Sequence, residues 1–545
     1  MKKNICLITL ICLLVFSGCE DKFVEPQYIP EFPWTSVDKM EMGVVAPYIN
    51  FFAPWSCPSA VYACYETLAT DISQLIPGQT IDAPFNEFYN RLHRESALES
   101  RTMGWVAGSY NSIYKTVAIT NESLAYLESD EPKKLFPNDN QSKLNEVNRQ
   151  KSELYFWRGY SYYWAALFFC PPYVPGGTNG DKVIPLKTDN LNLQNTKIGT
   201  TQEIWSQVIS DLAKAKTLMP LTWNKDGRVN YYGICGALAR AYLYMGDYAK
   251  ALKECDEIIS SGKYSLPNDL MASWNKLYSS SNISSEVIWN YVPNNLGASL
   301  FSRSFFARSL YGGFNSSRGA SFSQCSWVMT VMSNSALKRI GWMRNPQSDD
   351  FSLTDIAKTD KRLGGDNGFY LHLLGYKLQS ETGITDKIQY QMTYESTLKS
   401  LDFPHVYFDK FYRGGSSTDK NQLTRNPQMR LTEFILMRSA LKFKNGDKTG
   451  SASDLNVIRR RTGLSDIDPS ILTEDDIDRE YVIELAGEGV YLPYLIGLKR
   501  PILPGDRKGL EPVTAPYKNW FFRIPVDEIV KNAGYNGITD PNSLK

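Results

Sequence analysis

The chain has 545 residues, enough for one large domain or several smaller ones, with 59 lysines and arginines against 58 acidic residues. A net charge of +1 without basic clusters excludes nucleic acid as an expected partner, because phosphate binding needs grouped cations. Aromatic residues form 13% of the chain, which is enough for a large core and for planar surfaces that could meet a ligand.

The N-terminus has the pattern of a cleaved export signal. Two lysines precede an apolar run over 5–16, which is too short to span a bilayer, and small residues lead to Cys19. This ending resembles a bacterial lipobox, with Phe16 where Leu or Val is usual. We therefore expect 1–18 to be a lipoprotein signal peptide, Cys19 to be lipidated, and 19–34 to be a proline-stiffened tether. An ordinary secreted protein with a chance cysteine is the alternative.

Six cysteines remain beyond the signal and the lipid site. An exported protein can form disulfides, but the spacings fit no zinc pattern and do not determine any pairing. Buried free thiols are expected equally with disulfides. The six are Cys57, Cys64, Cys170, Cys235, Cys255 and Cys325.

Two segments in the first half predict buried helices. The segment 152–169 is apolar and aromatic nearly all round, which is typical of a helix inside a core, and two prolines follow it. Thr200 and Glu203 have the spacing of a capping box. Apolar residues then recur at helical intervals until Pro220.

A helix pair of the tetratricopeptide kind is predicted next. Small and apolar residues over 237–251 have that repeat's spacing, with Gly246 and Asp247 at the turn. Looser copies follow at 430–461 and 477–498.

Between the first two pairs lies a long insertion of a different composition. It covers about 260–429 and is rich in Gly, Ser, Asn and aromatic residues, and 286–291 alternates like a strand. Loops of this length in a compact protein are usually functional, because a rigid scaffold can hold binding residues on them.

Catalytic patterns are weak. The three histidines, His93, His372 and His405, have no paired metal-ligand spacing, and no nucleophile elbow or phosphate loop occurs. Glu484 and Glu488 offer two carboxylates, as glycosidases use, but such a spacing is common on solvated helix faces. We therefore expect no enzymatic activity and assign no catalytic residue.

Several short motifs occur in a characteristic order, and together they resemble the SusD/RagB family of outer-membrane nutrient-binding lipoproteins nearly end to end. The motifs are the lipobox ending at Cys19, Ala69-Thr70-Asp71, F-x-R-G-Y-x-Y-Y at 156–163, Val183-Ile184-Pro185-Leu186, the helix pair at 239–251, Asp360-Lys361-Arg362, L-N-x-I-R-x-R-T-G at 455–463, E-L-A-G-E-G at 484–489 and I-P-x-x-E-I at 524–529.

The resemblance implies a mostly α fold. Tetratricopeptide-like helix pairs would form one side, and a large irregular, loop-rich region would carry the ligand site. Residues 35–545 would form a single domain. Two places depart from the family pattern and put local ion pairs in doubt: Arg438-Ser439-Ala440 replaces an acidic A-E-A, and Val490, Tyr491, Tyr494 and Gly497 replace an Arg and a D-L-x-R.

The resemblance also implies a role. Family members bind nutrients, mostly glycans, at the cell surface and hand them to a SusC-like TonB-dependent transporter in the outer membrane. Glu20 and Asp21 resemble the signal that sends Bacteroidetes lipoproteins to the outer face, where a lipid anchor would hold the chain. Peptide binding within the same family is the alternative, and a helical-repeat interaction scaffold is a third hypothesis. No cofactor is expected, and a structural Ca²⁺ ion cannot be read from sequence.

The family's ligand aromatics come from the loop after the Thr-Asp segment and from the region after the second helix pair. Here those regions offer Phe85 and Tyr89, then Tyr311, Phe314 and Trp327, whose rings would stack on sugar faces. Neighbouring polar residues would bond hydroxyls or an acidic group: Asn86, Arg91, Asn315 and Arg318. A few ring contacts working against the ordering cost of association predict affinity on the order of micromolar to millimolar.

Overall fold

Helices dominate the architecture. The computed structural model describes residues 34–53, 56–75, 88–89, 103–137, 140–190, 196–270, 284–292, 330–343, 354–363, 370–373, 405–408, 426–517 and 522–538. In these parts of the chain the strands form two-stranded ladders only, so the mostly α class expected from the sequence is confirmed.

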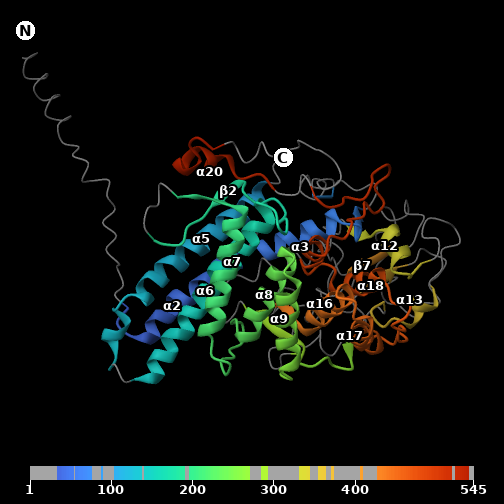
Figure 1. Cartoon of the computed structure of the whole chain (residues 1–545), viewed down its shortest axis with the longest axis horizontal. Coiled ribbons are helices and arrows are strands. Elements are labelled where there is room, and N and C mark those ends of the chain that lie inside the picture. Colours follow the sequence, from blue (N-terminus) through green and yellow to red (C-terminus); the bar gives the residue numbers. More distant parts are fainter. Residues whose placement is uncertain are drawn as a thin grey trace, which may run out of the picture.

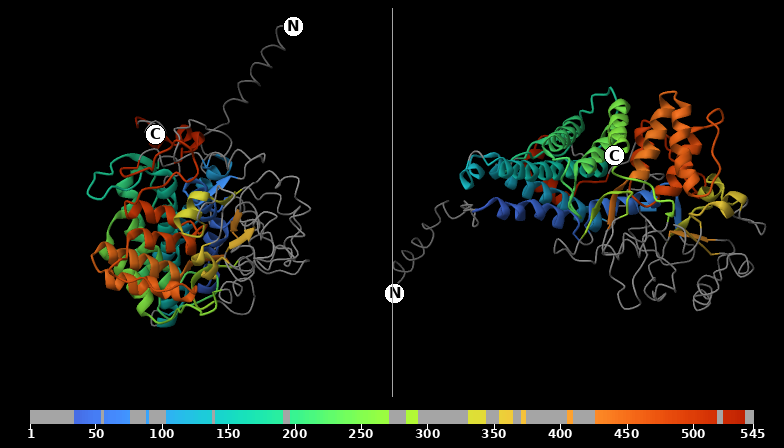
Figure 2. Two further views of the ribbon diagram at one scale, coloured as in Figure 1. Left: turned by 90° about the vertical axis from the view of Figure 1, so that its right-hand side faces the viewer. Right: turned by 90° about the horizontal axis from the view of Figure 1, so that it is seen from below.

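The helices stack largely in chain order. Each helix from α5 to α9 packs on the one before it, and α9 then packs on α16, so the insertion separates neighbours in sequence but not in space (Figure 1). The helix pairs gather on one side of α2 and α3 (Figure 2). The bounds are α2 Val37–Phe51, α3 Pro58–Ala69, α5 Met103–Glu128, α6 Gln141–Phe169, α7 Thr201–Leu218, α8 Tyr231–Met245, α9 Tyr248–Ser260, α16 Leu431–Lys444, α17 Lys448–Arg461, α18 Glu474–Leu485 and α19 Tyr491–Gly497.

Shorter elements complete the described chain. Helices α12 and α13 lie near α18, at the end of the molecule away from α2 and α5 (Figure 1). Their bounds, with the terminal and 3-10 helices, are α12 Asn334–Arg339, α13 Asp355–Thr359, α20 Val526–Lys531, η2 Pro132–Leu135 and η8 Ala533–Tyr535.

The aromatic helix forms the centre of the core, but it is longer than the sequence suggested. Helix α6 begins at Gln141, capped by the Asn140 side chain, and not at Ser152. Its polar first turns lack the apolar pattern on which the prediction relied. Trp157 and Trp164 are fully buried, and Trp157 packs edge to face on Tyr48 of α2 at a centroid distance of 4.6 Å.

The predicted capping box and the three helix pairs are confirmed. Thr200 Oγ1 accepts from Glu203 N at 3.1 Å, and the Glu203 carboxylate accepts from Thr200 N at 2.9 Å. The pairs are α8–α9, α16–α17 and α18–α19. Gly246 closes α8 with a φ of +77°, a backbone conformation in which a side chain would be strained, and Asp247 caps α9.

Antiparallel ladders hold the base of the insertion. Strand β4 (Val287–Tyr291) pairs with β8 (Asn426–Arg430), which runs straight into α16. The predicted strand at 286–291 is therefore confirmed, although all five β4 residues are buried and none alternates to solvent. The other ladders join β1 (Ser73–Leu75) with β5 (Thr330–Met332), β2 (Lys182–Pro185) with β3 (Ile198–Thr200), and β6 (Tyr370–Leu373) with β7 (His405–Phe408).

The signal peptide at 1–18 and all but the last residue of the tether at 19–34 lie outside the described residues, so their boundaries stay predictions. The single domain at 35–545 also stays a prediction. Among the described helices, none has the length and apolar character needed to cross a membrane.

The cysteines that the structure describes are buried. Cys64, Cys170, Cys235 and Cys255 are buried thiols, Cys57 is also buried, and Cys325 lies outside the described residues.

Candidate functional site

The β1–β5 ladder connects the two regions predicted to carry ligand aromatics. Leu75, the last residue of β1, is the Cα partner of Thr330, the first residue of β5. The chain therefore leaves β1 towards Phe85 and Tyr89 at the same end of the ladder where it arrives from Trp327, three residues before Thr330. Leu75 and Thr330, 255 residues apart in sequence, thus lie side by side at this end of the ladder.

Of the predicted aromatics, Tyr89 lies among the described residues. Phe85, Tyr311, Phe314, Trp327 and the predicted lipidation site Cys19 lie outside them, as do the neighbouring polar residues proposed to bond hydroxyls. Their roles therefore stay predictions.

Tyr89 is held at the edge of the core. Its neighbour Phe88 is fully buried, with its ring 5.6 Å from that of Tyr65 and 5.8 Å from that of Phe522. Tyr89 itself is half-buried, and the guanidinium carbon of Arg507 lies 3.8 Å from its ring centroid. The Phe88 ring is thus part of the core, and the Tyr89 ring packs half-buried against it.

A corner next to β1 brings together three charged residues that the sequence analysis missed. Arg339, at the end of α12, donates to Asp71 Oδ2 through Nε at 2.8 Å. Asp506 accepts from the backbone N–H groups of Asn334 and Ser335 at 2.7 and 2.8 Å, at the start of α12. The third is Arg507. The sequence signal that could have indicated Asp506 and Arg507 is Pro504-Gly505-Asp506-Arg507, in which two charged residues follow a Pro-Gly turn between helical segments.

Glu484, the first carboxylate of the candidate catalytic pair, lies inside a cluster of arginines. Its Oε1 accepts from Arg430 at 3.0 Å and from Arg461, and its Oε2 accepts from Arg362 at 3.3 Å. Burial would raise the pKa of Glu484, but the surrounding guanidinium groups, that of Arg461 foremost, lower it to about 2. A carboxyl group held ionised in this way cannot act as a general acid near neutral pH.

Glu488, the second carboxylate, belongs to the same cluster. It accepts from Arg430 Nη2 at 2.9 Å and Nε at 3.0 Å. The expectation of a solvated helix face is wrong, because α18 ends at Leu485 and Glu484 is fully buried. The described geometry gives these carboxylates a structural role.

The cluster continues into two more motifs of the family pattern. Arg362 Nη2 donates to Asp360 at 2.8 Å and to Glu480 at 2.7 Å, and Arg459 Nη1 donates to the other oxygen of Glu480 at 2.5 Å. The D-K-R, L-N-x-I-R-x-R and E-L-A-G-E-G motifs therefore meet in one buried ion-pair network. Their described contacts position the α16–α18 region.

The departures from the family pattern are also structural. Arg438 forms a bidentate pair with Asp454 of α17, with Nε and Nη2 at 2.8 and 2.6 Å from the carboxylate oxygens. Tyr494 stacks on Tyr481 at 3.9 Å between ring centroids and donates to Asp478 at 2.7 Å. The chain therefore has ion pairs and ring contacts of its own at these places.

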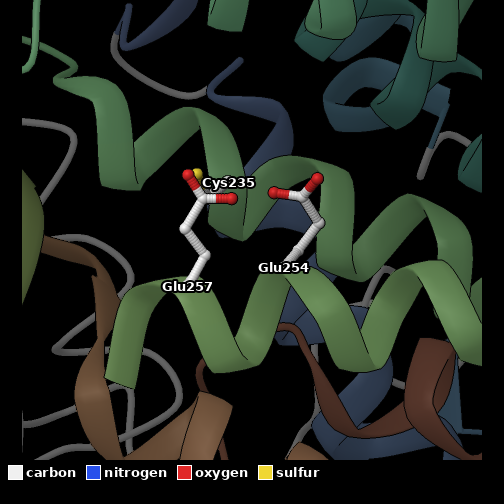
Figure 3. Close-up of side chains that lie close together, drawn as sticks. All are labelled: Cys235, Glu254 and Glu257. Atoms are coloured by element: carbon white, nitrogen blue, oxygen red, sulfur yellow. The ribbon is translucent and has the colours of Figure 1, made fainter. Parts of the chain in front are cut away.

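One group has the composition of a metal site. Glu254 and Glu257 rise from α9 towards Cys235 of α8, and their ligand atoms lie within 4.8 Å of one another (Figure 3). The Lys216 ammonium bonds both carboxylates, each at 2.7 Å, and so places a cation between them. Burial raises the pKa of the Cys235 thiol, which disfavours the thiolate that a metal needs. These residues fit an ion pair joining α7 to α9 better than a metal.

Two cavities open elsewhere in the described chain. One of about 170 Å³ is lined by polar and apolar residues at 224–230, 263–264 and 284–290, Trp289 among them. Another of about 270 Å³ is lined by tyrosines and prolines at 172–175 and 515–517 and by Tyr244. Neither includes Tyr89, so neither is assigned to the predicted ligand site.

Comparison with known proteins identifies the family. The model of the SusD family matches residues 359–492, and a family model described as starch-binding associating with outer membrane matches residues 82–243. Together they match more than half of the chain. No curated protein matches significantly.

Solved structures share the fold. A SusD superfamily protein from Bacteroides thetaiotaomicron has a TM-score of 0.66 at 19% identity, covering 92% of this chain and 98% of its own. Surface glycan-binding protein A from the same organism, in complex with laminarihexaose, has a TM-score of 0.63 at 17% identity, covering 91% and 98%. A laminarin-binding SusD-like protein has a TM-score of 0.59 at 16% identity, covering 91% and 99%. The motifs, the helix pairs and these matches agree, and the chain belongs to the SusD/RagB family.

Proposed function

We propose that the chain binds a glycan at the cell surface and delivers it to a TonB-dependent transporter of the outer membrane. The register of β1 and β5 carries the proposal. In this register the chain leaves β1 after Leu75 at the same end of the ladder where it enters β5 at Thr330, which supports one site for aromatic residues of the two segments that follow and precede these strands. Aromatic rings from the two regions can then act on one ligand.

The chemistry of these residues suits a sugar. Phenylalanine, tyrosine and tryptophan rings offer flat apolar faces to the CH faces of a pyranose, and tyrosine and tryptophan add a hydrogen-bonding edge. Two structural neighbours are named for binding laminarihexaose and laminarin, which supports a glycan as the ligand class here. Each stacked ring contributes roughly 1 kcal/mol, so affinity on the order of micromolar to millimolar is expected.

The anchor and the transporter form the second half of the proposal. A lipidated Cys19 would hold the chain on the outer membrane by a tether of about 15 residues. The ion-pair network and the stacked helix pairs would supply a rigid body above the transporter. No catalytic step is proposed, since the strongest carboxylate pair is fixed by arginines.

A binding screen tests the ligand class. The purified chain lacking residues 1–19 is run on native gels containing starch, laminarin, xylan, mannan or pectin. Retardation by at least one polysaccharide is expected. If no polysaccharide retards the chain while a peptide library raises its Tm, the glycan proposal is wrong and the peptide alternative replaces it.

Delivery is tested on the full-length lipidated chain. After gentle detergent extraction from its own membrane, the tagged chain should co-purify with a TonB-dependent barrel, and Cys19→Ala should remove it from the cell surface. A surface-anchored chain with no barrel attached would contradict the delivery step and leave glycan binding standing.

A further inference from the structure

The larger of the two cavities described above, which we call the tyrosine cavity, has a volume of about 270 Å³. This is below the range of roughly 300–1,000 Å³ that is typical of sites for drug-sized ligands, so the cavity suits a single ring and not a long chain. Every residue that lines it lies in the described part of the chain. The lining comes from 172–175 after α6, from 515–517, from Tyr244 of α8, and from Ile496, Gly497 and Lys499 at the end of α19.

Hydrogen bonds fix two walls of the tyrosine cavity. The Tyr517 hydroxyl donates to the carbonyl oxygens of Arg500 at 2.8 Å and Leu495 at 3.3 Å. The Tyr173 hydroxyl donates to the side-chain oxygen of Gln202 in α7 at 2.9 Å. Both rings are therefore held in place by the protein itself, as in a preformed binding site.

The carbonyl groups of α19 that border the cavity already accept hydrogen bonds. The carbonyl oxygen of Ile496 accepts from the backbone N–H of Lys499 at 3.0 Å. That of Gly497 accepts from the Tyr248 hydroxyl at 2.7 Å. The polar groups left for a ligand are therefore mainly donors, which favours a ligand rich in acceptors.

Tyr244 supplies one of these donors. It lines the cavity although only 4% of the residue is exposed, and its ring stacks on Trp205 at 4.8 Å between centroids. Its hydroxyl forms no hydrogen bond with the described residues, whereas a buried tyrosine hydroxyl usually has a partner. Burial raises the pKa of Tyr244 well above its usual range, so the hydroxyl keeps its proton and can donate it to a ligand.

Lys499 supplies the charge of the lining. Its side chain is exposed and forms no ion pair with the described residues, whereas its neighbour Arg500 is paired with Asp478 at 2.8 Å. The φ of Lys499 is +59°, a left-handed backbone conformation that favours glycine after a helix. The chain therefore has a lysine at a position where the backbone alone would favour glycine, and this lysine lies at the cavity.

We infer that the tyrosine cavity binds a hexuronate residue, in which the Lys499 ammonium pairs with the sugar carboxylate and the Tyr244 hydroxyl donates to a sugar oxygen. The tyrosine and proline faces of the lining match the CH faces of the ring, and a charge-assisted hydrogen bond recognises the carboxylate. The cavity shares no lining residue with the β1–β5 ladder, so this is a second site. The choice of a sugar among carboxylated rings rests on the proposed function.

Titration of the chain lacking residues 1–19 with glucuronate, glucose and benzoate tests the inference. Glucose lacks the carboxylate, and benzoate has the carboxylate on a ring without sugar hydroxyls. Glucuronate should bind about fivefold or more tightly than either. Lys499→Gln should remove the preference over glucose, and Tyr244→Phe, which keeps the ring on Trp205, should weaken glucuronate binding about threefold. Lys499→Gly should also remove the preference without lowering Tm, because glycine relieves the left-handed backbone.

Two control variants separate the cavity from general charge effects and from the predicted aromatic site. Lys531→Gln removes an exposed charge from α20, and Trp327→Ala changes the aromatic site, so both should keep the wild-type affinity for glucuronate. Equal affinity for glucuronate and glucose, or a preference that survives in Lys499→Gln, would overturn the inference. So would a loss in Trp327→Ala that is absent in Lys499→Gln.

The benzoate titration and the gel screen separate the remaining outcomes. Benzoate that binds as tightly as glucuronate would overturn the assignment of a sugar to the cavity. A wild-type chain that no polysaccharide retards would contradict the proposed function, while a glucuronate preference that is lost in Lys499→Gln would still support the cavity site. Retardation by a polysaccharide without any glucuronate preference would overturn this inference alone.

Discussion

Arg430 Nη1 lies 3.0 Å from Glu484 Oε1 and 2.8 Å from Glu286 Oε1. Arg430 is the last residue of β8, Glu286 directly precedes β4, and Glu484 lies in α18. One arginine therefore joins the base of the insertion to the helix pairs. We conclude that the two strands at the ends of the insertion, β4 and β8, are fixed to the helix pairs by buried charge as well as by their own ladder.

Replacing the central carboxylate should destabilise the fold strongly. Glu484→Gln would leave Arg362, Arg430 and Arg461 without their shared anion in a buried place, which should lower the free energy of unfolding by about 3–5 kcal/mol. Urea denaturation measures the difference. The control is Asp466→Asn, which breaks an exposed pair with Arg460 and should cost less than about 1 kcal/mol. A Glu484→Gln chain as stable as the control would contradict the structural role of the network.

Acid should weaken the same network. The pKa of Glu484 is about 2 in the folded chain, against about 4.3 for a free glutamate. A lowered pKa means that its contribution is present above the unfolded value and disappears as pH falls from about 5 to 2. Unfolding free energies at pH 6 and pH 3 should therefore fall more for the wild type than for Glu484→Gln. Parallel losses in the two chains would show that the folded carboxyl group titrates normally.

Glu66 should have the opposite pH dependence. It is buried in α3 and accepts from Leu492 N at 2.8 Å, and burial raises its pKa to about 8. A raised pKa means that its stabilising contribution is present below the unfolded pKa, about 4.3, and is lost as pH rises through 8. Glu66→Gln keeps the acceptor without the charge, so its Tm should fall less than that of the wild type between pH 5 and 8. A variant with the wild-type slope would place the titration elsewhere.

The Cys235–Glu254–Glu257 group should not depend on metal. Because Lys216 already bridges both carboxylates, EDTA and added Zn²⁺ should each leave the wild-type Tm unchanged. Lys216→Met should lower Tm, since the two carboxylates would then face each other without a cation. A wild-type Tm that falls with EDTA and recovers with Zn²⁺ would show that a metal holds this group.

The sequence predicted the scaffold well, for physical reasons, while the residues of the ligand site stay predictions. Gly246 and the Thr200–Glu203 box could be read because local backbone demands leave local signals. The start of α6 was missed because its first turns are polar, and the burial of Glu484 was missed because its partners come from distant segments. Arg507 was missed for the same reason, because its contact Tyr89 lies far from it in sequence.

Affinity measurements on site variants test most directly whether aromatic rings beside the β1–β5 ladder hold a glycan. Titrations with the polysaccharide that retards the wild-type chain would compare Trp327→Ala with Tyr242→Ala, which removes a half-buried ring from α8 on the helical side. We predict that Trp327→Ala weakens binding about fivefold or more, with Tm preserved, while Tyr242→Ala binds like the wild type. Equal affinity for the wild type and Trp327→Ala, or an equal loss in both variants, would contradict the proposed site.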